Sequence, residues 1–122
     1  MEQPKLFGTK KVGGAADAER LVLYALGEFQ ARGLALAGRE LPLDRLRGAL
    51  RRAAEDLGVE ELSDEASVAA FESLGARVRR VPPFVAKHPY RVTVGTELSE
   101  RARGLYEEQT AQPADETAGG AD

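Results

Sequence analysis

Residues 77–94 read RVRRVPPFVAKHPYRVTV. Apolar and polar residues alternate at both ends of this stretch, over 77–81 and 90–94, and such period-two alternation is typical of β-strands with one buried face. Prolines fill the segment between the two ends, so the pattern predicts an antiparallel hairpin with a stiff loop. The residues expected to point inward are Val78, Tyr90, Val92 and Val94.

The same stretch has an unusual charge. Acids and bases are mixed elsewhere in the folded part of the chain, but no Asp or Glu lies between Ser73 and Thr96. The bases in this interval are Arg77, Arg79, Arg80, Lys87 and Arg91. Alternation places Arg77, Arg79 and Arg91 together on the outer face, where forked guanidinium donors suit phosphate oxygens. The alternative is a solvated face whose arginines pair with acids from elsewhere or protect an exposed sheet edge.

The loop between the two predicted strands carries an apolar pair, Phe84 and Val85. The simplest interpretation is that Phe84 packs back under the hairpin. Two alternatives are that it protrudes as an anchor for a partner protein, or that its ring stacks or wedges against nucleic-acid bases.

Outside the hairpin, helical spacing of apolar residues predicts four helices. They begin near Asp17, Leu43, Ser63 and Thr96 or Ser99, and the first three end at Gly33, Gly58 and Gly75. Residues 34–37, between two glycines, are too short for a helix and are predicted as a short strand. The fourth helix is expected to end near Glu108.

The predicted fold class is α+β, a small helical domain with a β-hairpin. The order of elements is helix, strand, helix, helix, strand, strand, helix over residues 17–108. This order resembles that of winged-helix domains, and the resemblance lies in element order rather than in any residue motif. An α+β sandwich, with helices on one face of a small sheet, is the alternative.

The two ends differ from the middle in composition. Residues 1–16 contain three glycines together with Lys10 and Lys11, which predicts a flexible basic arm. Residues 109–122 are acidic and low in apolar residues, which predicts a disordered tail. The net charge of the chain is −3, but residues 1–106 hold 17 bases and 15 acids, a net of +2. The folded part is therefore close to neutral.

The helices give mixed support for a nucleic-acid partner. In helix-turn-helix proteins the second helix of the motif enters the major groove. Here that helix, 64–75, presents Asp64, Glu65 and Glu72 and no base, so it would repel phosphates. The preceding helix carries four arginines, of which Arg45 and Arg52 lie opposite its leucine stripe and are expected to be exposed. A solvated helix face is the favoured interpretation.

Catalytic and metal-binding motifs are not found in the sequence. There is no cysteine, and His88 is the one histidine, so a zinc site of the usual composition is not predicted. The segment 8–14, GTKKVGG, lacks the Gly-Lys-Ser/Thr ending of a phosphate-binding loop. Adjacent acids lie at predicted helix ends, where they cap or solvate. We therefore expect no cofactor and no enzymatic activity. No apolar run approaches a membrane span and no leader pattern is present, so a cytoplasmic location is expected.

The sequence leads to two functional hypotheses. The first is a non-enzymatic domain that binds DNA or RNA phosphates through the hairpin, helped by Lys10 and Lys11. The second is a protein-interaction module, or a homodimeric subunit of a larger assembly, that docks through the hairpin with Phe84 and Val85.

Overall fold

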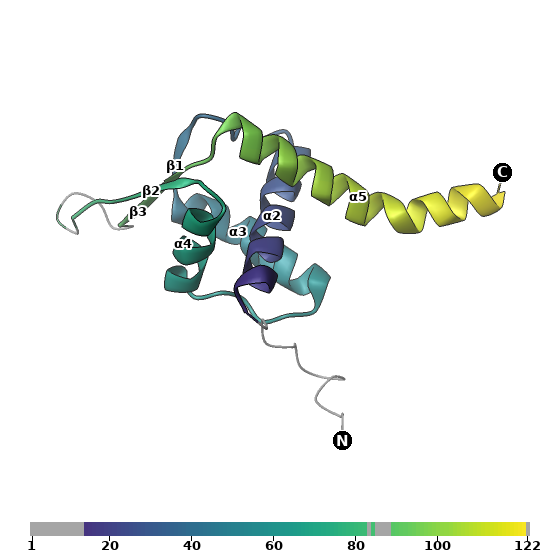
Figure 1. The fold of residues 1–122 in the computed structure, drawn as a ribbon, viewed down its shortest axis with the longest axis horizontal. Coiled ribbons are helices and arrows are strands. Elements are labelled where there is room, and N and C mark those ends of the chain that lie inside the picture. The colour runs from purple at the N-terminus through teal and green to yellow at the C-terminus, as the bar shows by residue number, and fades with distance from the viewer. Residues whose placement is uncertain (1–13, 83, 85–88, 122) are drawn as a thin grey trace, which may run out of the picture.

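The computed structural model describes residues 14–82, 84 and 89–121. Within this part the chain is α+β, with four helices and a three-stranded antiparallel sheet. The hairpin projects from one end of the fold and α5 extends away at the other (Figure 1). The elements are α2 (Ala15–Ala31), β1 (Glu40–Pro42), α3 (Leu43–Leu57), α4 (Asp64–Ser73), β2 (Arg77–Arg80), β3 (Tyr90–Thr93) and α5 (Thr96–Ala121).

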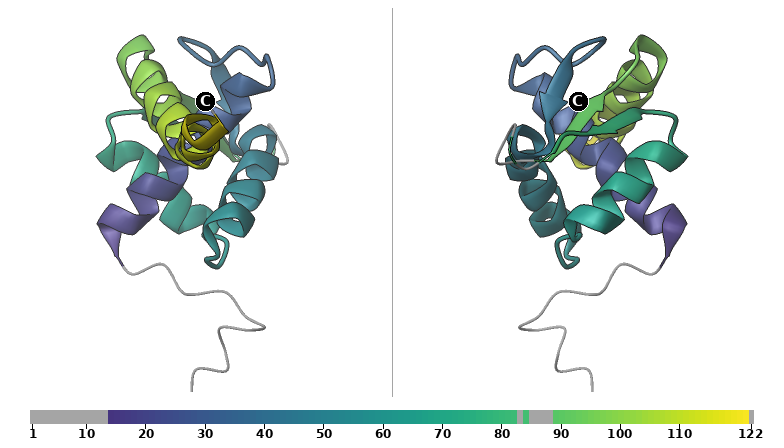
Figure 2. Two further views of the ribbon diagram at one scale, coloured as in Figure 1. Left: turned by 90° about the vertical axis from the view of Figure 1, so that its right-hand side faces the viewer. Right: turned by 90° about the vertical axis from the view of Figure 1, so that its left-hand side faces the viewer.

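Helix α2 is the centre of the core. Every residue from Leu21 to Phe29 is buried, so the helix is enclosed on all sides instead of showing one apolar stripe. It contacts α3, α4 and α5. Both views of Figure 2 place α3 and α4 on opposite sides of the fold, with α5 above them. The sheet adds Leu41, Val92 and Val94 to the same core.

Local signals end α3 and bound α4, as predicted. Gly58 ends α3 in the left-handed conformation, with φ 69°, and Gly75 follows α4 with φ 99°. Both conformations favour glycine because it has no Cβ. At the start of α4 the Ser63 hydroxyl accepts a hydrogen bond from the Ala66 N–H at 3.1 Å. This bond satisfies one of the free donors at the helix N-terminus.

The short strand is not where the sequence predicted it. Residues 34–37 form no strand; the strand is β1, at Glu40–Pro42. The Arg39 N–H donates a hydrogen bond to the Leu36 carbonyl at 3.2 Å and forms a turn. The extended segment therefore begins only after this turn. Residues 34–37 meet the sheet only at an isolated bridge between Ala37 and Val94.

Helix α5 is longer than predicted. The expectation was an end near Glu108 followed by a disordered tail at 109–122, but the helix continues to Ala121. Residues 107–112 are mostly Glu, Gln and Ala, which favour helix, and the helix continues past Pro113 although proline has no N–H for the backbone hydrogen bond. Helix α2 likewise begins at Ala15, two residues before the expected Asp17.

Helix α2 also buries a carboxylate. Glu28 is 7% exposed and accepts two hydrogen bonds from Arg52, at 2.8 and 3.0 Å, and one from Arg32 at 2.6 Å. Burial alone would raise the pKa of Glu28, but the hydrogen bonds from Arg52 and Arg32 outweigh it and lower this pKa. The prediction that Arg52 is exposed is therefore wrong: it is half-buried and paired.

None of the helices in the described part of the chain has the length and apolar character needed to span a bilayer.

Candidate functional site

The hairpin forms as predicted, and its register defines two faces. Strand β3 lies between β1 and β2, and Val92 is paired with Leu41 on one side and Val78 on the other. This apolar row points to the core, with Val92 1% exposed. Alternation then places Arg77, Arg79, Arg91 and Thr93 on the outer face, as the sequence predicted.

Two of the outer arginines face each other. Arg79 on β2 is the direct cross-strand partner of Arg91 on β3, whereas Arg77 is opposite Thr93. Like charges directly opposite each other destabilise a strand pair. The outer face therefore holds a concentration of positive charge that an anion would relieve.

One anion is already present, from an element that the sequence placed wrongly. Glu40 on β1 accepts two hydrogen bonds from Arg79, from Nε at 2.9 Å and from Nη2 at 2.8 Å. This pairing is the fork-to-carboxylate geometry that Arg also uses with phosphate. The hydrogen bond from Arg79 lowers the pKa of Glu40, and the nearby charge of Arg91 adds to that effect. Arg79 is thus neutralised within the fold.

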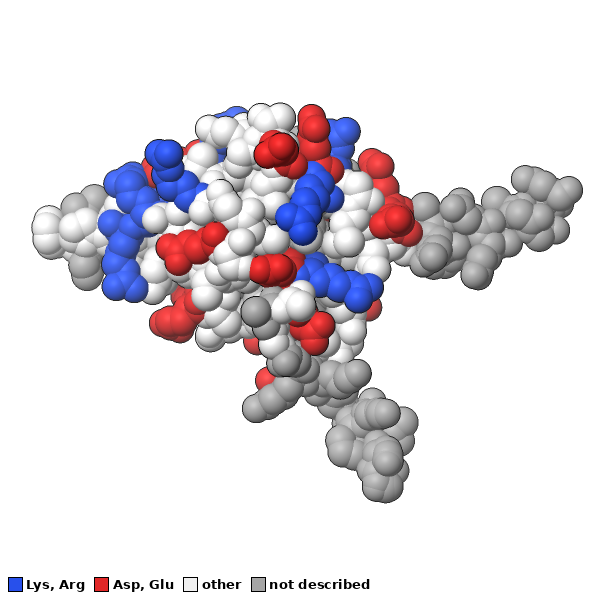
Figure 3. Space-filling model, viewed as in Figure 1, with Lys and Arg blue, Asp and Glu red and all other residues white. Residues whose placement is uncertain are grey.

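Arg77 and Arg91 are different. Within the described residues neither side chain makes an ion pair or a side-chain hydrogen bond. Arg77 is exposed and Arg91 is half-buried on the same face. Three guanidiniums therefore share this face with one carboxylate. Figure 3 shows Lys and Arg side chains gathered toward the hairpin end, whereas acids and bases mix over the rest of that view.

Arg80 belongs to the opposite face. It pairs in register with Tyr90, donates a hydrogen bond from Nη2 to the Tyr90 hydroxyl at 2.5 Å, and places Cζ 4.9 Å from the centroid of that ring. This is a cation–π contact with a nearly buried aromatic. The five predicted phosphate contacts of the hairpin therefore do not form one surface.

The tip of the hairpin contradicts the simplest interpretation of its sequence. Phe84 does not pack under the hairpin; it is 89% exposed. The ladder continues one step past the strands, because the Val81 N–H bonds the Pro89 carbonyl at 2.6 Å. The other predicted site residues, Lys10, Lys11, Val85 and Lys87, lie outside the described residues, as does His88.

The arginines of α3 are mostly engaged by acids. Arg47 Nη2 lies 3.1 Å from Asp64 Oδ1 on α4, and Arg51 Nε lies 3.2 Å from Glu61 Oε2. With Arg52 bound to Glu28, only Arg45 on this helix has no ion pair in the part of the chain described. The exposed surface of α4 keeps Glu65 and Glu72. These helices do not extend the positive face of the sheet.

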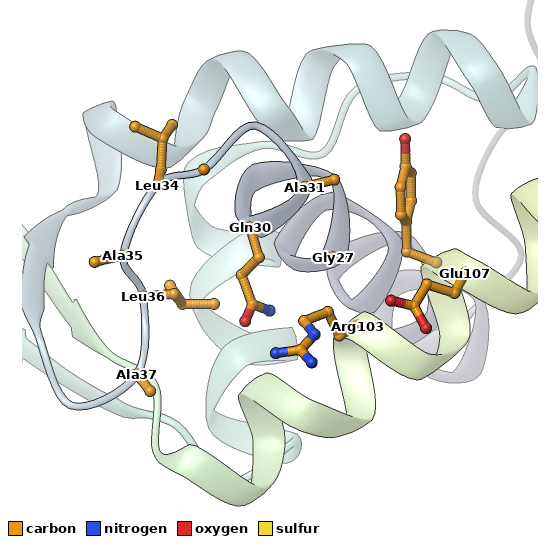
Figure 4. A pocket seen from close by; sticks show the side chains of 11 residues that line it. Gly27, Gln30, Ala31, Leu34, Ala35, Leu36, Ala37, Arg103 and Glu107 are labelled. Carbon is orange, nitrogen blue, oxygen red and sulfur yellow. The ribbon is translucent and has the colours of Figure 1, made fainter.

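A groove of about 660 Å³ lies elsewhere, between the end of α2, the loop that follows it and α5 (Figure 4). The side chains of Gln30 and Arg103 point into it, and Leu34 stands at its rim with 44% of its surface exposed. The Gln30 amide is already used, since Nε2 donates to the Ser99 carbonyl at 2.9 Å. No sequence motif indicated this groove, and residues 34–37, which line it as a loop, were predicted to be a short strand.

Among the residues described, no group of three or more His, Cys, Asp or Glu side chains could hold a metal ion.

Family models, curated proteins and solved structures were compared with this chain, and none of them matches it.

Proposed function

We propose that this chain is a small, non-enzymatic nucleic-acid-binding domain that contacts phosphates through the outer face of its sheet. The observation that carries the proposal is the pair Arg77 and Arg91, exposed or half-exposed on one face, neither of which is held in an ion pair or side-chain hydrogen bond among the described residues. The direct opposition of Arg79 and Arg91 adds a site where an anion would relieve repulsion.

The topology supports a winged-helix arrangement for this domain. The described elements run α2, β1, α3, α4, β2, β3, α5, and β3 lies between β1 and β2. In such an arrangement the hairpin β2–β3 is the wing. Helix α4 would be the recognition helix, but its exposed acids, Glu65 and Glu72, oppose entry into a groove lined by phosphates. The proposal therefore assigns binding to the wing.

The direct test removes the two unpaired charges. We expect Arg77→Gln with Arg91→Gln to weaken binding to a fluorescein-labelled 20-base-pair duplex roughly tenfold or more at low salt. Each lost phosphate contact should also reduce the slope of log affinity against log salt by about 0.9. Fluorescence anisotropy at several salt concentrations measures both quantities.

The matched control removes the same charge from other surfaces. Arg20 on α2 and Arg101 on α5 are exposed and have no ion pair within the described residues. Arg20→Gln with Arg101→Gln should leave the salt slope nearly unchanged. Equal weakening by both double variants would mean that net charge, and not the sheet face, drives binding.

Glu40 provides a second prediction with the opposite sign. Because Glu40 occupies Arg79 as a phosphate would, we expect Glu40→Gln to tighten binding several-fold and to steepen the salt slope by about 0.9. Glu97→Gln, at an exposed position on α5, changes the net charge equally and serves as the control in the same titration. Weaker binding by Glu40→Gln would show that the Glu40–Arg79 pair shapes the interface and does not compete with the ligand.

The exposure of Phe84 favours a second candidate function, a protein-interaction module that docks through the hairpin tip. Sedimentation velocity of the protein alone tests the homodimer form of this candidate. A dimer that Phe84→Ala converts to monomer, in a chain that binds no nucleic acid, would select it.

A further inference from the structure

We infer that the hairpin tip takes unpaired nucleobases, with the ring of Phe84 as the stacking surface, so that the ligand is single-stranded nucleic acid or an unpaired end. This inference rests on the proposed function and names its ligand class. Phosphates would lie along the outer face at Arg77 and Arg91, and a base would stack at the tip.

Exposure distinguishes Phe84 from the other large apolar side chains. Among the described residues only Phe84 and Leu34 are large hydrophobic residues with high exposure, at 89% and 44%. Leu34 borders the groove beside α5, whereas Phe84 stands beyond the last ladder bond of the hairpin. An aromatic ring held in water gives the free protein no packing energy, and a ligand with a π-face would supply the contact that this ring lacks.

Described residues define the two points at which the loop that carries Phe84 leaves and rejoins the sheet. The hydrogen bond from the Val81 N–H to the Pro89 carbonyl closes the loop. Pro82 and Pro89 then fix the backbone φ angle at each end of it.

Charge complementarity identifies the class of partner. No Asp or Glu lies between Ser73 and Thr96, so the hairpin itself carries only positive and neutral side chains, and the Glu40 carboxylate of the neighbouring strand is bound by Arg79. Arg77 and Arg91 lie on one face of the ribbon and Arg80 on the other, above Tyr90. A cationic ribbon that ends in an exposed ring matches a polyanion with accessible bases.

Unpaired bases fit this geometry better than a continuous duplex. The faces of paired bases are already covered by their neighbours in the stack, so a ring could reach them only by forcing a base step open. In a single strand every base has a free π-face. The exposed acids of α4 also prevent the body of the domain from approaching a major groove closely.

The test uses the absence of tryptophan from the chain. Phe84→Trp introduces a single fluorescent reporter at the tip of the full-length protein. We expect its emission to be quenched on addition of a 12-nucleotide oligo-dT, and to be little changed by a blunt 12-base-pair duplex at the same phosphate concentration. Unchanged emission with bound oligo-dT, confirmed by anisotropy of the labelled strand, would overturn the inference.

Two further variants separate stacking from apolar docking. Phe84→Ala and Phe84→Leu should each weaken oligo-dT binding, by roughly 5- to 150-fold for the alanine variant, because both lack a π-face. Duplex binding should change less than twofold. If Phe84→Leu retains wild-type affinity, the side chain acts as an apolar contact and the stacking inference is wrong.

The outcomes also separate this inference from the proposed function. One outcome is that the protein binds duplex and single strand with equal affinity, that Phe84→Ala has no effect, and that Arg77→Gln with Arg91→Gln weakens binding. This outcome would refute base stacking at Phe84 and would still support phosphate binding on the outer face of the sheet. No binding of either form at low salt and tens of micromolar protein would refute both.

Discussion

Replacing Gly27 with alanine is expected to lower the free energy of unfolding by about 2 kcal/mol, although alanine is the better helix former by about 1 kcal/mol. The reason is the close approach of α2 and α5. A Cβ on Gly27 would lie 2.3 Å from the Tyr106 Cβ and 2.5 Å from the Ala102 carbonyl oxygen. A backbone oxygen cannot rotate away, so α5 must shift as a unit, and it would carry Tyr106 away from its edge-to-face contact with Tyr24.

Gly104 gives the matched control, because it lies in α5 with nothing within 4 Å of an added Cβ. Gly104→Ala should raise stability by about 0.5–1 kcal/mol through helix propensity alone. Thermal melts followed by circular dichroism measure both changes, and the Gly27 variant should melt roughly 6–10 °C lower than the wild type. Similar gains in the two variants would show that α2 and α5 do not pack as closely as the structure has them.

The second large effect concerns the carboxylate of Glu28. We expect Glu28→Gln to destabilise the fold by about 2 kcal/mol at pH 7, since it leaves two guanidiniums with one neutral acceptor. The value lies below that for a fully buried pair, because the side chains of Arg52 and Arg32 keep 38% and 51% of their surface exposed. Glu100→Gln, exposed on α5, should change stability by no more than about 0.5 kcal/mol.

The pH dependence identifies the charge as the cause. The pKa of Glu28 is lowered in the folded state, so its ionised form stabilises the fold above the unfolded-state pKa of about 4.3. This stabilisation is lost as the pH falls through the lower, folded-state pKa. Urea melts should therefore show a constant difference between wild type and Glu28→Gln above pH 5, shrinking below pH 4. A difference that persists unchanged at pH 2–3 would assign the effect to packing.

The parts of the fold that depend on local chemistry could be predicted from the sequence. Ser63 caps α4, and Gly58 and Gly75 end their helices, because each signal acts within a few residues. The hairpin was predicted because alternation and a proline-rich loop act within 18 residues. The outer placement of Arg77, Arg79 and Arg91 followed from that alternation.

The parts that depend on distant partners could not be predicted. Strand β1 has three residues, includes a proline, and exists because it pairs with β3 some 50 residues later. The Glu40 carboxylate reaches Arg79 only because β1 pairs with β3. The ion pair between Glu40 and Arg79 could therefore not be predicted from the sequence. The exposure of Phe84 likewise has no local signal, because an aromatic beside prolines is compatible with either packing or protrusion.

The burial of α2 on every side from Leu21 to Phe29 has a signal in the sequence. Helical spacing groups Leu21, Val22, Ala25, Leu26 and Phe29 into an apolar stripe, and Leu23, Tyr24 and Gly27 continue the apolar character around the helix. A helix that is apolar on every side is typical of a core position. In that setting, Glu28 would have been predicted to need a cationic partner.

The enclosure of α2 has a consequence for synthesis. The residues that cover its last side, Leu98 and Ala102 on α5, leave the ribosome long after Phe29. At ordinary elongation rates the delay is roughly 4–15 s. During that time α2, the most apolar segment of the nascent polypeptide, is not covered by α5. The order of translation therefore makes the aggregation-prone helix α2 first and α5, which shields it, last. The close contact at Gly27 can therefore form only after α5 has been synthesised, and until then α3 and α4 are the helices that can cover α2.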